Sequence, residues 1–180
     1  MKEKIIDAIQ KIEKASQDKN TDYFCTSRDI FQARLDSYII RTQQYLLSAI
    51  IGEIGNNTFD HNWDYAEGHL RGLYFNTDIS NQIILGDFGR GVKKSLAAVR
   101  KCNTDLEAIK VAFTEQVSGR APEQRGNGLK FVLESIKEKN WYLYFQSGSG
   151  CCIIEDGNVS FLETEVHFDG CFAFIKTGEK

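Results

Sequence analysis

The stretch GEIGNNTFDHN concentrates groups that can do chemistry in a segment whose apolar residues have helical spacing. Glu53, Asn57 and His61 recur at every fourth position, and Asp60 lies three residues after Asn57. An α-helix would therefore place all four side chains on one face. Polar groups are costly to bury without partners. This face is thus either the solvated side of an amphipathic helix or a surface that holds a charged ligand.

Two glycine-rich stretches follow later in the chain. ILGDFGRGV supplies Asp87 together with Gly89 and Gly91, so the backbone can approach a ligand while a carboxylate accepts one directed hydrogen bond. RGNGL carries Gly126 and Gly128 at the start of an expected helix, where exposed N–H groups and the helix dipole suit a phosphate. Each stretch taken singly is also compatible with an ordinary glycine-rich turn.

The order of these three stretches resembles the GHKL superfamily of Bergerat-fold ATPases. Glu53 and Asn57 match its N box, residues 87–91 match its G1 box, and residues 126–129 match its G2 box. The resemblance covers residues 44–176 and points to the stand-alone members that are similar to anti-sigma serine kinases. It implies one domain over residues 1–180, with N-terminal helices in 1–43, an ATP-binding core in 44–176 and an ATP lid in 92–125.

The resemblance also implies the cofactors, ATP and Mg²⁺, and a role for each site residue. Glu53 would be the catalytic base, Asn57 would hold Mg²⁺, and Asp87 would accept a hydrogen bond from the adenine amino group. The remaining residues expected to contact ATP are His61, Gly89, Gly91, Ser118, Arg120, Arg125, Gly126, Asn127, Gly128 and Leu129.

Three features depart from the pattern of the family. Asp60 stands where many histidine kinases have Lys or Arg, and Lys130 stands where a third glycine is common. The chain has three histidines, His61, His69 and His167, and none precedes the ATP-binding core. We therefore expect that the protein is not a conventional histidine autokinase.

The elements that position these residues follow from periodicity. Helical spacing predicts helices over 2–16, 27–42, 44–62, 104–115 and 127–139, and the stripe Leu47, Ile51, Ile54 and Thr58 is the apolar side of the third. Short β-rich segments predict a strand pair before residue 90 and three or four strands after residue 140. This layout predicts an α+β fold, a two-layer sandwich with helices on one face of a mixed, mostly antiparallel sheet.

Composition narrows the classes of partner and the cellular compartment expected for the protein. The net charge is −3, which gives no indication of nucleic-acid binding, and no apolar run approaches the length of a membrane span. Five cysteines without a C-x-x-C pair predict reduced thiols and a cytoplasmic protein. Adjacent Cys151 and Cys152 should face opposite sides of a strand.

Two functions remain open at this stage. The first is a regulatory ATPase or protein kinase in signal transduction that acts on a protein partner. The second is an interaction module that binds a nucleotide without catalysis. Glu53 favours the first, and Asp60 together with the missing phosphoacceptor favours the second. A structural domain without nucleotide is the weakest interpretation. DFG at 87–89 lacks the rest of the protein-kinase signature, and no βαβ unit supports a Rossmann site.

Overall fold

The computed structural model describes residues 1–61, 65–115 and 127–178. Its helices are α1 (Lys2–Gln17), α2 (Arg28–Thr42), α3 (Tyr45–His61), α4 (Gly91–Leu96), α5 (Asp105–Thr114) and α6 (Gly128–Glu138). Its strands are β1 (Phe24–Cys25), β2 (Leu73–Asn76), β3 (Gln82–Asp87), β4 (Tyr142–Glu155) and β5 (Asn158–Lys176). The five predicted helices are present, with ends within one or two residues of the expected positions.

The strands form one sheet in the order β1-β2-β3-β5-β4, and every recorded pairing is antiparallel. The predicted α+β class is confirmed, and the described sheet is antiparallel throughout. β3 is central, because β2 and β5 pair with its two edges. Asp87, its last residue, lies opposite Cys171 of β5.

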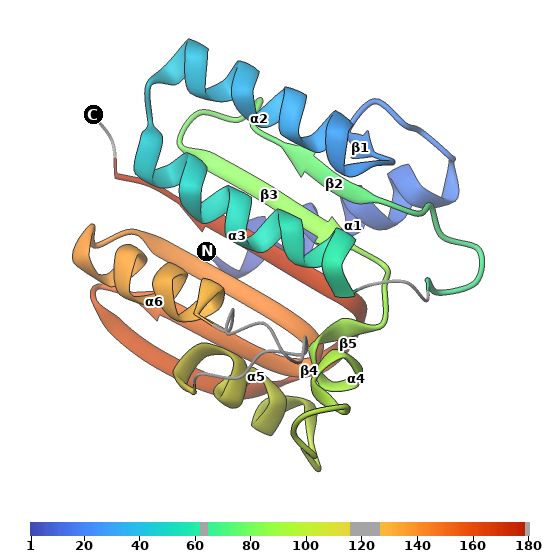
Figure 1. Ribbon diagram of the computed structural model, residues 1–180, viewed down its shortest axis with the longest axis vertical. Helices are drawn as coiled ribbons and strands as arrows, with labels where there is room; N and C mark the ends of the chain where they lie inside the picture. The colour runs from blue at the N-terminus through green and yellow to red at the C-terminus, as the bar shows by residue number, and fades with distance from the viewer. Residues whose placement is uncertain (62–64, 116–126, 179–180) are drawn as a thin grey trace.

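Helices α2, α3, α5 and α6 cover one face of the sheet and build the larger core with residues such as Ile51, Ile109 and Ile136. Figure 1 shows α3 and α6 side by side in front of the sheet and α1 behind it. α1 packs Ile5, Ala8 and Ile12 into a second buried cluster on that far face. The prediction that the helices cover one face of the sheet is thus correct for α2, α3, α5 and α6, whereas α1 covers the opposite face.

The last two strands are longer than the sequence suggests. The glycines of the segment SGSG, residues 147–150, favour a break between two strands, but the segment is part of β4, and its pairing with β5 shifts register between Gln146 and Gly150. Such a shift reverses which residues face each side. Leu143 and Phe145 face the larger core before it, and Cys152 and Ile154 do so after it. Cys151 belongs to the second cluster, so the two adjacent cysteines face opposite sides as predicted.

The cysteines in this structure are all free thiols, and four of the five are buried. Within the described ranges, no helix is long and apolar enough to cross a membrane.

Candidate functional site

A cleft of about 510 Å³ opens on the face of the sheet that carries α3 and α6. Its walls come from α3, α4 and the start of α6, and its floor comes from β3 and β5. This volume lies within the range of small-ligand sites, about 300–1,000 Å³. The polar face of α3 is therefore a wall of a cleft and not simply a solvated surface.

Asp87 is the charged group on the floor of this cleft, and only 2% of its surface is exposed. Thr58 Oγ1 donates a hydrogen bond to one carboxylate oxygen at 2.8 Å, and the Gly89 N–H donates to the other at 2.9 Å. Burial nevertheless raises the pKa of Asp87 from 3.8 to about 6, because water is excluded from the charged form. The hydrogen bonds from Gly89 and Thr58 oppose this rise.

Thr58 is a residue of the candidate site that the sequence analysis placed only in the apolar stripe of α3. It is buried, as its place in the apolar stripe of α3 predicts, but its hydroxyl is the side-chain donor to Asp87. A threonine in an apolar helical stripe is the one available signal, because a buried hydroxyl requires a hydrogen-bond partner.

The four polar residues predicted on one face of α3 all line the cleft. Glu53 is exposed, whereas Asn57, Asp60 and His61 are partly buried. Asn56, which the sequence analysis did not single out, lines the cleft as well. Together they place carboxylate, amide and imidazole groups above Asp87.

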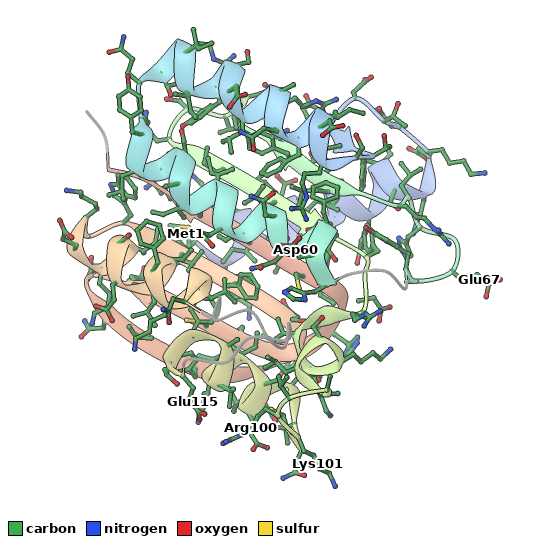
Figure 2. All side chains as sticks on the ribbon, viewed as in Figure 1. Met1, Asp60, Glu67, Arg100, Lys101 and Glu115 are labelled. Carbon is green, nitrogen blue, oxygen red and sulfur yellow. The ribbon has the colours of Figure 1, made fainter. Side chains whose placement is uncertain are left out.

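Asp60 does not face the cleft as an isolated carboxylate. Arg28, the first residue of α2, forms a salt bridge with it through Nη2 and also lines the cleft. Asp60 lies near the C-terminal end of α3, where Figure 2 labels it. The repulsion that Asp60 would exert on an anionic ligand is therefore reduced by a neighbouring cation.

The start of α6 meets α3 at Glu53. Asn127, Gly128 and Leu129 line the cleft, and a Cβ placed on Gly128 would collide with the Glu53 carboxylate. Gly128 thus allows the carboxylate to approach the helix N-terminus, where its negative charge is favourable. Lys130 is exposed and is not among the described residues that line the cleft, which places it on the outer side of α6.

The two glycines after Asp87 have different positions. Gly91 lines the cleft at a φ of +74°, and a Cβ there would lie 2.7 Å from Ser147 Oγ. Gly89 is buried and does not contribute to the described lining, but its N–H holds Asp87. Both glycines therefore shape the floor, and of the two Gly91 reaches the cleft itself.

The predicted lid is described only in part. α5, within residues 92–125, buries Ile109 and Phe113 in the larger core, so this part of the segment is a packed helix. The other candidate contacts, Ser118, Arg120, Arg125 and Gly126, lie outside the described residues.

Comparisons with known proteins give little beyond this geometry. No protein-family model and no curated protein matches the chain. Two similar solved structures are the B subunit of DNA gyrase from Myxococcus xanthus and the N-terminal domain of a DNA repair protein. The first has a TM-score of 0.38 and 11% identity over 73% of this chain and 37% of that one. The second has a TM-score of 0.35 and 14% identity over 72% and 36%.

The chain spans little more than a third of the length of either structure.

Proposed function

We propose that this protein binds ATP with Mg²⁺ in the cleft and acts as a regulatory ATPase or protein kinase on a protein partner. The observation that carries the proposal is Asp87, a buried carboxylate held by Thr58 and Gly89 on the floor of a cleft. A fixed acceptor in a nearly water-free setting is suited to reading the amino group of adenine. Guanine presents a carbonyl oxygen at the same position, which a carboxylate would repel.

The phosphates would lie between α3 and the start of α6. Asn57 offers an amide oxygen to the cleft, and the N–H groups at the start of α6 favour anions. No group of three or more His, Cys, Asp or Glu side chains in the described residues could hold a metal by itself. This fits Mg²⁺, which commonly uses one or two protein ligands together with substrate phosphates. When bound, it would neutralise charge on those phosphates, and Asn57 would be its protein ligand.

Glu53 distinguishes a catalyst from a binding module. Its carboxylate lies one helical turn before Asn57 and beside Gly128, at the end of the cleft proposed for the terminal phosphate. There it can accept a proton from an attacking water or from a hydroxyl of a partner protein. Repulsion by Asp60 would favour a non-catalytic module, but the salt bridge with Arg28 weakens that reason. We therefore favour catalysis and keep the module as the alternative.

The acceptor of any phosphoryl group would be water or another protein. His69 stacks on Phe88 with ring centroids 3.9 Å apart, and its Nδ1 lies 3.2 Å from Ser16 Oγ. It therefore packs the segment before β2 against α1. His167 lies on β5, 3.3 Å from Asp169. Neither histidine belongs to the described lining of the cleft. The five free cysteines support a reducing compartment, and we propose the cytoplasm.

Calorimetric titration with ATP and with GTP, each with Mg²⁺, tests the proposal directly. We expect ATP to bind and GTP to bind far more weakly. For substitutions at Asp87, the matched control is Asp36→Asn, which changes a carboxylate on the exposed side of α2. Equal affinities for ATP and GTP would contradict the assignment of Asp87. A phosphate-release assay then separates the two functions, because the catalytic one requires turnover that Glu53→Ala removes.

A further inference from the structure

The cleft has an unusual charge balance for a site that would take a polyanion. Glu53, Asp60 and Asp87 bring three carboxyl groups to its lining. Among the described residues of that lining, Arg28 is the one with a permanent positive charge. A nucleotide would bring further negative charge, so Arg28 is the cation of the described lining best placed to offset it.

Arg28 is fixed at both ends. Its backbone begins α2 directly after Ser27, whose hydroxyl caps the helix by accepting the Ile30 N–H at 3.3 Å. Its side chain is held by Asp60, and the two side chains differ in exposure, 47% for Arg28 and 16% for Asp60. The carboxylate is therefore largely covered while about half of the arginine side chain remains accessible. A guanidinium has five N–H donors, so pairing with one oxygen leaves others to bind a phosphate.

The position of Asp60 along α3 indicates which phosphate of the nucleotide Arg28 would contact. On α3, Glu53 lies beside the first residue of α6, Gly128. Asn57 follows one turn later along α3, and Asp60 lies three residues beyond Asn57. Seven residues of α-helix separate Glu53 from Asp60 by about 10 Å along the axis. If Glu53 faces the terminal phosphate, Arg28 lies toward the other end of the phosphate chain, next to the ribose.

We infer that Arg28, the salt-bridge partner of Asp60, binds the α-phosphate of the nucleotide. This inference rests on the proposed function, because it requires adenine at Asp87. It assigns a binding role to a residue of α2, a helix outside the three motifs.

A purely structural role for the pair makes a different prediction. Arg28→Gln and Asp60→Asn both break the salt bridge, so a pair that only joins α2 to α3 would respond to the two changes alike. A phosphate-binding Arg28 would respond oppositely, because Arg28→Gln removes the cation and Asp60→Asn removes a nearby negative charge.

The experiment is an NMR titration of adenosine, AMP and ADP into the full chain, since this method also measures weak binding. For Arg28→Gln we expect the dissociation constants of AMP and ADP to rise by about tenfold, the effect of one lost charged contact, and that of adenosine to change less than about twofold. Asp60→Asn should leave AMP and ADP binding unchanged or tighter. Arg41→Gln is the matched control, because Arg41 is an exposed arginine on α2 whose side chain contacts Thr77 and not the cleft.

Thermal unfolding of each variant shows whether it is folded. Equal losses of AMP affinity in Arg28→Gln and Asp60→Asn, or an equal loss for adenosine, would overturn the inference and leave the proposed function standing. So would unchanged AMP affinity in a folded Arg28→Gln variant. If the wild-type chain bound neither adenosine nor ADP, the proposed function itself would fall.

Discussion

Replacing Asp87 by asparagine separates ligand recognition from folding. The exchange keeps the shape of the side chain and removes its charge. The amide oxygen of the new side chain can still accept the Gly89 N–H, and its amide nitrogen can donate to the Thr58 oxygen, so these two of its neighbours keep a partner. The change therefore acts mainly on the buried charge and on the ligand.

The two effects have opposite signs. The rise of the Asp87 pKa from 3.8 to about 6 means that the ionised carboxyl costs the folded state about 3 kcal/mol. Because the folded pKa is raised, the favourable contribution of protonated Asp87 is fully present below about pH 4 and is lost as the pH rises through about 6. Asp87→Asn should therefore raise the free energy of unfolding at pH 8, by as much as about 3 kcal/mol, and by much less at about pH 4.5.

Binding should weaken in the same variant. A hydrogen bond to a charged group contributes about 1.5–3 kcal/mol, so ATP affinity should fall by roughly 10- to 150-fold. In the wild type, adenosine affinity should decrease as the pH falls below about 6, since the protonated carboxyl is a weaker acceptor. Asp87→Asn should remove this pH dependence.

Denaturant unfolding at pH 8 and pH 4.5 measures the first effect, and calorimetric titration with ATP at pH 8 measures the second. Asp36→Asn, which alters an exposed carboxylate that accepts from Gln32, should change neither quantity. A large loss of stability at pH 8 would refute the argument that burial dominates the energetics of Asp87. ATP affinity that survives the change would refute its role in reading adenine.

Three further predictions concern the rest of the site. Asn57→Ala should abolish Mg²⁺-dependent tight binding of ATP, whereas Glu53→Ala should spare binding and remove turnover; equal losses of affinity by titration would contradict this division of roles. Gly91→Ala should lower the free energy of unfolding by about 1–3 kcal/mol in a denaturant titration, because its φ is +74° and a Cβ would crowd Ser147; an unchanged midpoint would speak against that strain. The purified protein incubated with labelled ATP should carry no acid-labile label, and label lost on replacing one of its three histidines would restore the autokinase alternative.

The helices were predictable because their signals are local. The 3.6-residue period predicted the ends of α1, α2, α3, α5 and α6 to within one or two residues. A local signal also begins α5, because Thr104 caps this helix by accepting the Glu107 N–H. The strand lengths were less predictable. Glycines in SGSG indicate a turn, but here Gly148 takes a φ of +61° inside a register shift of β4.

The site could be predicted only where one segment carried the signal. Glu53, Asn57 and His61 have helical spacing, so their common face was predictable from the sequence, whereas the cleft that this face lines is seen only in the structure. Arg28 could not be found in this way, because its partner Asp60 is 32 residues away and only the packing of α2 on α3 brings them together. The partnership of Thr58 with Asp87 likewise spans two elements.

The placement of α1 affects how this protein could be divided. Ile12 packs against the backbone of Gly86 on the side of the sheet opposite the cleft, one residue before Asp87. A fragment that began at residue 44 would keep the three motifs but would uncover Phe88, Phe172 and the rest of the second cluster. An apolar surface of this kind leads to aggregation. The smallest fragment expected to remain monodisperse therefore includes α1, although α1 itself contains none of the residues proposed to touch the nucleotide.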